Sequence, residues 1–350
     1  MNITKKVIAK LNKCYALSEL TYQGKDCFLV AAEKQDPCYL FSKSGEQLAT
    51  VWEQPGGVMT MTPVPGTDGT FLATHKFYSP NDSAEAKIVI AEPNGEGEWK
   101  VRTLVDAPFV HRFGILERGG VRYLIVCCLK SGHAYKDDWS MPGRVFTAEL
   151  PDDLSPYDER HQLPLTELKT GMLKNHGYCL VREKDYDTAL VTCEQGVFQF
   201  VPPEARGGNW EIRQLLDVPT SDAVLLDFDG DGKLELGCMS PFHGDQLAIY
   251  HLDEAGNYQK AWEYSEPCEF LHAIWAGRLS CGPAWVVGHR KGKRNTMLIR
   301  YNPDAGYTTE IIDEDAGAAN VMHFVNPAGE DVLIAANREI DEISMYTFTW

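Results

Sequence analysis

Short apolar segments separated by turn-forming residues make up most of the chain. Segments such as DCFLVAAE, GTFLATHK, VRYLIVCCL and DVLIAAN are rich in valine, isoleucine, tyrosine, phenylalanine and cysteine, and glycine, proline, aspartate and asparagine lie between them. Apolar or alternating runs of this length indicate half-buried β-strands, whereas the longer period of amphipathic helices is hard to find. The pattern therefore predicts an all-β protein.

The segments repeat with a common internal frame. LHAIWAGRLSCGPAWVVGHRKG aligns without gaps to ANVMHFVNPAGEDVLIAANREI, which matches His272 to Asn320 and His289 to Asn337. The same frame fits five further stretches, so that the units begin near residues 14, 58, 111, 176, 222, 272 and 320. Units of this size are typical of four-stranded propeller blades. We predict one domain over residues 1–350, a seven-bladed β-propeller; a pair of irregular β-sandwiches is the alternative, which the ungapped repeat disfavours.

The way the ring closes can also be predicted. The last unit supplies three strand-like segments, NVMHFV, DVLIAAN and ISMYTFTW, before the chain reaches Trp350. The segment KVIAKL, within residues 1–11, precedes the first unit and belongs to no other. We expect it to pair as the outer strand of the last blade, which would remove an exposed sheet edge.

Charge and composition narrow the function classes. The 350 residues carry a formal net charge of -17, which disfavours nucleic-acid partners and anionic membrane surfaces. No apolar run approaches the length that spans a bilayer, and no apolar core follows the lysines near the N-terminus. The ten cysteines contain no CxxC pair and lie mostly inside strand-like runs, which is typical of buried, reduced thiols. We therefore expect a cytoplasmic protein.

The segment DFDGDGKLEL has the composition of a cation-binding loop. Asp227, Asp229 and Asp231 alternate with other residues, and Glu235 follows. Carboxylates at alternate positions converge when glycines let the loop bend, and oxygen-only ligands suit Ca²⁺ or Mg²⁺. The segment resembles the DxDGDGxxE loop of FG-GAP (VCBS-type) propeller repeats, which implies a structural calcium ion. A solvated acidic hairpin without metal is the alternative.

The repeat frame places the other candidate residues at the end of the propeller opposite this hairpin. The first strand of each blade runs along the axis and the second returns, so that the start of the first and the end of the second meet at one end. We call this end the channel mouth. The strand starts there include His111, His176, Asp222 and His272, and the strand ends include His75, Lys76, Glu194, His289, Arg290 and Arg338. Several titratable groups around one axis favour a functional site.

Three imidazoles and a carboxylate form a plausible ligand set for Zn²⁺, Mn²⁺ or Fe²⁺. We predict His111, His176 and His272 as ligands, with Asp222 as a further ligand or as the group that orients one. An open coordination position would then polarise a substrate oxygen. In the structural alternative, the histidines only hydrogen-bond the loops between blades.

A metal-free site is a second chemical possibility. One histidine would act as general base, and Lys76, Arg290 or Arg338 would stabilise an enolate. The basic segment GHRKGKR (288–294) lies at this end, and its positive charge favours a carboxylate, phosphate or developing enolate. A solvated turn is the alternative.

Two long loops border the channel mouth. KFYSPNDSAEA (76–86) and KSGHAYKDDWSMPG (130–143) each connect the second and third strands of a blade. The second loop contains His133, Tyr135 and Trp139, and aromatic rings beside hydrogen-bonding groups suit a sugar ring and its hydroxyls. Together with Glu194 and His289 these side chains are the predicted substrate contacts, because loops on a rigid scaffold often carry specificity. A polar surface loop is the alternative.

The segments HRFGIL, KNHGY, DFDGDG and LHAIWAGRL, set in this ring of blades, look like the propeller portion of aldos-2-ulose dehydratase/isomerase. The chain is similar more loosely to metal-dependent propeller polysaccharide lyases. The resemblance covers nearly the whole chain at the level of the repeat and implies elimination of water or an alcohol β to a sugar carbonyl. That reaction needs a base, a cation and an acid. We assign anion stabilisation to Arg290 or Lys76 and proton transfer to Tyr178 or His75.

The predicted function is therefore a carbohydrate lyase or dehydratase that acts on a keto-sugar or uronic-acid-type substrate with the help of a metal. The competing class is a non-catalytic propeller that binds a glycan or a protein partner, because fold does not decide function. A glycosidase would need two acids at the channel mouth, for which only Asp222 and Glu194 qualify. GxSxG, HExxH and P-loop motifs are absent from the sequence.

Overall fold

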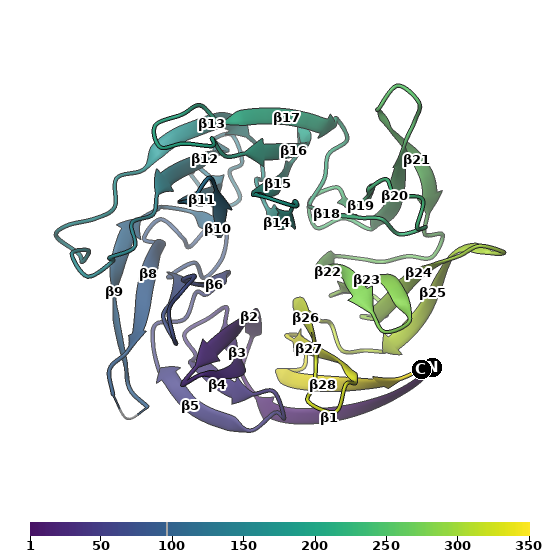
Figure 1. The fold of residues 1–350 in the computed structure, drawn as a ribbon, viewed down its shortest axis with the longest axis horizontal. Helices are drawn as coiled ribbons and strands as arrows, with labels where there is room; N and C mark the ends of the chain where they lie inside the picture. The colour runs from purple at the N-terminus through teal and green to yellow at the C-terminus, as the bar shows by residue number, and fades with distance from the viewer. Residues whose placement is uncertain (96) are drawn as a thin grey trace.

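Seven four-stranded antiparallel sheets are arranged around a common axis (Figure 1). The structure is a computed structural model that describes residues 1–95 and 97–350. Six sheets use strands that are consecutive in the chain, and the seventh has the order β1-β28-β27-β26. The predicted seven-bladed β-propeller is confirmed.

The strands of the first three blades follow the predicted repeat. Blade 1 contains β2 (Cys14–Tyr22), β3 (Lys25–Ala32), β4 (Cys38–Ser42) and β5 (Gln47–Trp52). Blade 2 contains β6 (Met61–Pro63), β7 (Phe71–His75), β8 (Lys87–Pro93) and β9 (Trp99–Asp106). Blade 3 contains β10 (Val110–Arg118), β11 (Val121–Lys130), β12 (Pro142–Glu149) and β13 (Thr166–Met172).

The remaining four blades keep the same order of strands. Blade 4 contains β14 (Gly177–Arg182), β15 (Asp187–Cys193), β16 (Gly196–Val201) and β17 (Glu211–Leu216). Blade 5 contains β18 (Asp222–Leu226), β19 (Glu235–Ser240), β20 (Gln246–Leu252) and β21 (Tyr258–Glu263). Blade 6 contains β22 (Leu271–Leu279), β23 (Gly282–His289), β24 (Thr296–Asn302) and β25 (Gly306–Asp313). Blade 7 contains β26 (Asn320–Val325), β27 (Asp331–Asn337), β28 (Glu342–Thr349) and β1 (Asn2–Lys10).

The first and last strands of the chain close the ring. β1 pairs with β28 from Asn2 opposite Thr349 to Lys10 opposite Glu342, and the two termini lie side by side at the rim (Figure 1). The strand predicted within residues 1–11 is thereby confirmed. Its pairing covers the backbone edge of β28 and joins the start of the chain to its end.

Apolar side chains fill the spaces between neighbouring sheets. One buried cluster joins Phe28 and Phe41 of blade 1 to Phe324, Ile334 and Ile343 of blade 7. Burying a side chain of this size contributes about 1.5–3 kcal/mol. The ring is therefore closed by hydrophobic packing as well as by β1.

The cysteines of the chain are free thiols, and Cys281 is the exposed one. This agrees with the interpretation of buried thiols within strands. Among the described residues, no helix has the length and hydrophobicity needed to cross a membrane.

The strand register separates the two candidate cation sites. In blade 5, Asp222 pairs with Met239 at one end of the β18–β19 hairpin, and Leu226 pairs with Glu235 at the other end. The loop 227–234 therefore lies at the end opposite Asp222. The predicted placement of the acidic hairpin away from the channel mouth is confirmed.

Candidate functional site

Three blades share an irregularity at the start of their first strand. The pairing register shifts there, and the residues left out of the ladder are Tyr15 in β2, His111 in β10 and His272 in β22. A β-bulge re-aims a side chain. In this case the Tyr15 hydroxyl lies 3.0 Å from His272 Nε2 and 3.5 Å from His111 Nε2. The sequence frame was wrong by one position in blade 1, because Tyr15 and not Cys14 is the equivalent of His272.

Four imidazoles gather at the channel mouth. The ring centroid of His176 lies 4.3 Å from that of His111, 5.3 Å from that of His272 and 5.0 Å from that of His243. The structure thus brings together the three histidines that the sequence singled out. It adds His243, which lies in the loop between β19 and β20.

Each of the three predicted histidines forms a hydrogen bond through Nδ1 to an oxygen atom that can only accept one. His111 Nδ1 lies 3.0 Å from the carbonyl oxygen of His176, and His272 Nδ1 lies 2.7 Å from that of Ala319. His176 Nδ1 lies 2.8 Å from Asp222 Oδ2. Nδ1 therefore carries the proton, and in a neutral ring Nε2 keeps a lone pair that can accept a proton or bind a metal. Carboxylates and carbonyls orient metal-binding histidines in this same way.

His176 provides the strongest sign of a missing ligand. Its side chain is only 1% exposed, yet its Nε2 has no hydrogen-bond partner among the described residues. Leaving a buried polar atom unpaired costs about 1–3 kcal/mol. Potential ligand nitrogens of His176, His243 and His272 all lie within 4.8 Å of one another. These three residues could hold a metal ion, with His243 in place of the predicted ligand His111.

His243 is held in an aromatic stack. Its ring centroid lies 3.9 Å from that of Phe242 and 4.2 Å from that of Phe270, with both pairs stacked. The repeat frame missed His243 because it covers only strand starts and strand ends. The available signal was the loop sequence SPFHG, a histidine beside an aromatic residue in a loop at the channel mouth.

Burial favours the neutral form of these rings. Desolvation lowers the pKa of His111 and His272 well below the usual value and lowers the pKa of His243 to about 2, and the nearby His176 acts in the same direction. Neutral imidazole is the form that binds a metal or accepts a proton. The electrostatics of the cluster therefore suit metal binding, and a proton accepted by one of these rings would be released readily.

Tyr15 is a buried proton donor between two of the histidines. Burial raises the pKa of its hydroxyl to about 12, so that it stays protonated at neutral pH. A hydroxyl has one proton to donate, and without a metal the shorter contact directs it to His272 Nε2. A metal ion on that nitrogen would displace this bond and free the Tyr15 proton for another acceptor. Tyr15 was not predicted as a site residue because the repeat frame in blade 1 was wrong by one position.

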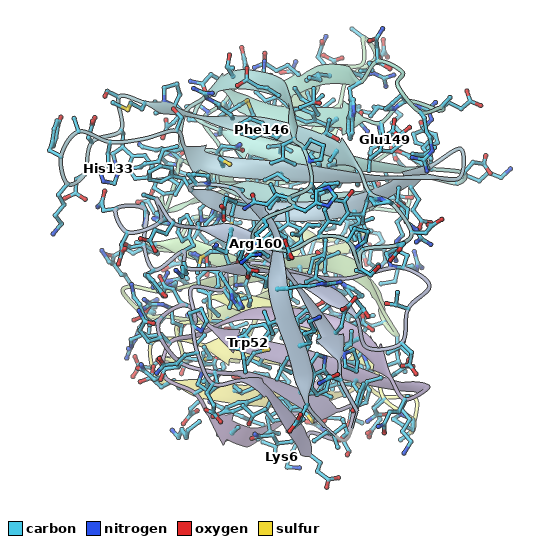
Figure 2. All side chains as sticks on the ribbon, turned by 90° about the vertical axis from the view of Figure 1, so that its left-hand side faces the viewer. Lys6, Trp52, His133, Phe146, Glu149 and Arg160 are labelled. Carbon is cyan, nitrogen blue, oxygen red and sulfur yellow. The ribbon has the colours of Figure 1, made fainter. Side chains whose placement is uncertain are left out.

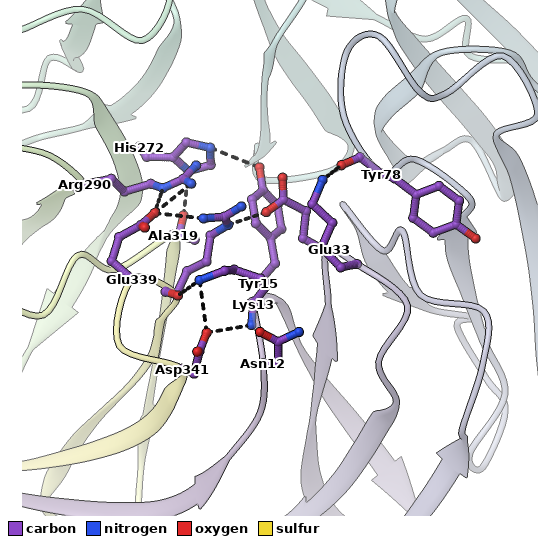
Figure 3. Close-up of polar contacts among 12 residues, drawn as sticks. Asn12, Lys13, Tyr15, Glu33, Tyr78, His272, Arg290, Ala319, Glu339 and Asp341 are labelled. Carbon is purple, nitrogen blue, oxygen red and sulfur yellow. Dashed lines mark hydrogen bonds and ion pairs between the residues drawn. The ribbon is translucent and has the colours of Figure 1, made fainter.

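The arginines predicted to stabilise an enolate are neutralised by carboxylates (Figure 3). Arg290 Nε lies 2.8 Å from Glu339 Oε1, and Arg338 Nη1 lies 2.9 Å from the same oxygen. Arg338 also pairs with Glu33. This network joins blades 6, 7 and 1 across the channel mouth, which is a structural role that the sequence analysis did not foresee.

Other predicted catalytic residues make their contacts away from the histidine cluster. His75 packs edge-to-face on Trp52 with a centroid distance of 4.7 Å, and burial lowers its pKa to about 3. Lys76 Nζ lies 3.2 Å from a carboxylate oxygen of the exposed Glu85. The structure therefore does not bring these two residues into the cluster.

Tyr178 lies in the channel but its hydroxyl is turned into the protein. A side chain at Gly114 would collide with this hydroxyl, which is buried and has no partner among the described residues. Burial raises the pKa of Tyr178 well above its usual value. A phenol in this position is a poor proton acceptor at neutral pH.

The loop 130–143 projects beyond the body of the propeller at the end where His133 lies (Figure 2). His133 packs on Phe109 at a centroid distance of 5.7 Å, and Tyr135 is exposed. Trp139 instead turns inward, where its ring lies 5.3 Å from that of Phe242. The loop thus supports the segment that carries His243, and its predicted contact with a sugar remains a prediction.

The two remaining predicted substrate contacts are already bonded to neighbours. Glu194 pairs with Lys174 at 2.9 Å. His289 Nδ1 lies 2.9 Å from the carbonyl oxygen of Lys291, and its Nε2 accepts from the backbone of Asn295 at 3.1 Å. Both ring nitrogens of His289 therefore stabilise the loop that follows β23.

The acidic hairpin forms a second candidate cation site. Carboxylate oxygens of four residues lie within 4.8 Å of one another, those of Asp227, Asp229, Asp231 and Glu235. Burial is the main reason why the pKa of the Glu235 carboxyl is raised to about 7, and the negative charges of the three aspartates raise it further. His251 also lies within 4.8 Å of Asp229 and Glu235, so that this end offers one nitrogen in addition to the predicted oxygens.

A cavity of about 220 Å³ lies in the channel. The first strands of all seven blades line it, and its polar side chains include Thr60, Arg112, Asp222 and Asn320. Asp222 also bonds His176, so that the cavity adjoins the histidine cluster. Pockets for drug-sized ligands occupy about 300–1,000 Å³, and this cavity therefore suits a smaller molecule.

Comparison with known proteins supports the fold and no particular activity. No protein-family model and no curated protein match the chain. Among solved structures, a streptogramin B lyase is similar at a TM-score of 0.55 and 13% identity, covering 99% of this chain and 98% of that chain. The structure of BBS1N in complex with ARL6DN is similar at a TM-score of 0.59 and 11% identity, covering 99% of this chain and 95% of that chain. A glucose dehydrogenase is similar at a TM-score of 0.50 and 12% identity, covering 99% of each chain. The chain is thus similar in fold to propellers that include a lyase, a dehydrogenase and a protein in a complex.

Proposed function

We propose that the channel mouth is the active site of a metal-dependent carbon–oxygen lyase that acts by β-elimination on a small keto-sugar or sugar acid. The observation that carries the proposal is the buried, unpartnered Nε2 of His176, close to nitrogens of His243 and His272. The resemblance of HRFGIL and KNHGY to the propeller portion of aldos-2-ulose dehydratase/isomerase supplies the reaction class.

The donor set fits a transition metal. His176, His243 and His272 would hold the ion, and Asp222 would orient His176 through its Nδ1. Three imidazoles suit Zn²⁺, Mn²⁺ or Fe²⁺ better than calcium. Such an ion, when bound, supplies a Lewis acid that polarises a substrate carbonyl.

Two neighbouring side chains account for the proton transfers. His111 Nε2 has the lone pair that accepts a proton from the carbon next to the carbonyl, and Tyr15 donates its hydroxyl proton to the leaving oxygen. The carbon–oxygen bond breaks as the carbon–carbon double bond forms. Because Tyr15 Oη and His111 Nε2 are 3.5 Å apart, the proton can return from the imidazolium to the phenolate. The low pKa of His111 favours this return.

At the opposite end we propose a structural calcium ion. The oxygens of Asp227, Asp229, Asp231 and Glu235 provide the ligands, and the resemblance to the FG-GAP loop suggests the ion. The role would be local, because the hairpin lies away from the histidines.

A non-catalytic propeller that binds a glycan or a protein is the second candidate. One observation favours it, which is that His111, His176 and His272 are each at most 3% exposed. The aromatic stack around His243 also limits access from the channel mouth.

Metal analysis and an elimination assay on the same preparations separate the two candidates. We expect the purified protein to contain a transition metal that is lost in His176→Ala and kept in His75→Ala, a matched control because both histidines are buried. Keto-sugars and uronosides would be screened for the absorbance of a conjugated enone. Equal metal content in the two variants would contradict the metal site, and a flat absorbance trace across the panel would favour the binding protein.

A further inference from the structure

We infer that Arg112 binds a carboxylate group of the ligand, so that the channel cavity selects small sugar acids over neutral sugars. This inference rests on the proposed function for the nature of the reaction, but the charge preference can be tested without it. Arg112 lies next to His111 in β10 and lines the cavity. Arg112 was not among the site residues predicted from the sequence.

Arg112 differs from the other arginines of the channel mouth in having no acidic partner. Its Nη1 donates to the carbonyl oxygen of Met59 at 2.6 Å. Within residues 1–95 and 97–350, no carboxylate oxygen lies within 4.0 Å of its guanidinium nitrogens, whereas Arg290 and Arg338 both have such partners. In a chain with a formal net charge of -17, an unpaired cation beside a cavity is unusual and points to an anionic ligand.

Among the described residues, Arg112 is the one cation in the cavity wall. The other polar side chains that line the wall are Thr60, Thr62, Tyr178, Asp222 and Asn320. Asp222 is the one anion, and its Oδ2 already accepts from His176 at 2.8 Å and from Ser221 Oγ at 3.0 Å. The amide of Asn320 donates to the carbonyl oxygen of Tyr15 at 2.8 Å. Arg112 is therefore the side chain best suited to hold an anion.

The position of Arg112 defines how a ligand would lie. Its guanidinium carbon is 5.8 Å from the ring centroid of Tyr15, whose hydroxyl contacts His272. A ligand carboxylate at Arg112 would thus place the adjoining carbons toward the histidine cluster. Arginine presents two parallel donors to a carboxylate, which fixes orientation as well as charge.

The test compares a sugar acid with its neutral ester at low salt. D-glucuronate and methyl D-glucuronate would be titrated by calorimetry into the full chain, with and without a chelator. A hydrogen bond to a charged group is worth about 1.5–3 kcal/mol. We therefore expect the acid to bind about ten- to hundredfold more tightly than the ester, and Arg112→Gln to abolish this difference.

Arg118 provides a matched control. It lies at the other end of β10, donates to the carbonyl oxygen of Pro202 at 2.7 Å and covers the ring of Tyr186 at 4.5 Å. Arg118→Gln should keep the preference for the acid, and circular dichroism would verify that both variants are folded. Arg112→Lys should keep a weaker preference, because lysine retains the charge and loses the paired donors.

The outcomes separate this inference from the proposed function. A preference for the acid that depends on Arg112 and survives the chelator supports the inference even if no metal is found. Equal binding of acid and ester, absence of binding by both, or an equal loss in Arg118→Gln would overturn it. Elimination from a sugar acid at the same rate in Arg112→Gln would overturn the inference and leave the lyase standing.

Discussion

The two ends of the propeller offer a cation very different surroundings. At the channel mouth, imidazoles from blades 3, 4, 5 and 6 meet in one cluster, in which carbonyls and a carboxylate fix the proton on Nδ1 of His111, His176 and His272. At the opposite end, one hairpin of blade 5 supplies all four carboxylates, and its aspartates already accept bonds from backbone amides of the same loop. The first site depends on the closed ring, whereas the second depends on a few consecutive residues.

This difference matters for what each site can do. Buried neutral nitrogens with an unsatisfied lone pair suit a transition metal and chemistry in a dry cavity. Carboxylate oxygens from one short loop suit calcium and a structural role. The comparison therefore favours the proposed chemistry at the end that is built from several blades and a local structural ion at the end that is built from one.

The largest expected effect is a loss of folding stability when one carboxylate is removed at the channel mouth, compared with the removal of one carboxylate at the hairpin. Glu339→Gln leaves Arg290 and Arg338 without their shared partner at the channel mouth. Breaking a buried ion pair costs about 3–5 kcal/mol, and partial exposure of Glu339 should reduce this to roughly 2–3 kcal/mol. Asp231→Asn in the metal-free hairpin should change the free energy of unfolding by less than about 0.5 kcal/mol. Urea denaturation measures both, and equal effects would contradict the contrast between the ends.

A second prediction concerns the group that orients His176. Asp222→Asn removes the charge opposite His176 Nδ1. Losing such a partner typically weakens metal binding by about 10–100-fold. Competition with a chromophoric zinc chelator measures the affinity. Unchanged affinity would show that Asp222 does not serve the metal site, and calcium binding at the hairpin should be unaffected in either case.

The smallest expected effect is at the hairpin. Calcium at ten times its dissociation constant should stabilise the fold by about 1.4 kcal/mol, and Asp229→Asn should remove this gain. Glu254→Gln, an exposed residue in the same blade, is the control and should keep it. Thermal unfolding with calcium or with chelator measures the shift. If calcium has no effect on the unmodified protein, the hairpin is a solvated acidic turn.

Much of the fold was predictable from the sequence, because each blade repeats the same pattern of buried strands. The ring closure by β1 followed from counting strands in the last unit, and the register placed His111, His176 and His272 at one end. The error at Tyr15 has a physical cause. Cys14, Tyr15 and Ala16 are consecutive and all buried, and an uninterrupted apolar run cannot show which of its residues is the unpaired one of the β-bulge.

The site was less predictable than the fold because side-chain partners are not periodic. The frame put Arg290, Arg338 and Lys76 at the channel mouth, but it could not show that Glu339, Glu33 and Glu85 neutralise them. Nor could it show which loop residue would reach the axis. His243 does so because the short loop after β19 turns inward and stacks on Phe270.

The central claim is that neutral imidazoles from separate blades form a transition-metal site. An anomalous-difference map at the zinc absorption edge, from crystals grown with zinc, tests it most directly. The account predicts a strong peak about 2.0–2.1 Å from nitrogens of His176, His243 and His272, and no such peak in His176→Ala. A map with density only at the acidic hairpin, or with none at the histidines, would contradict it.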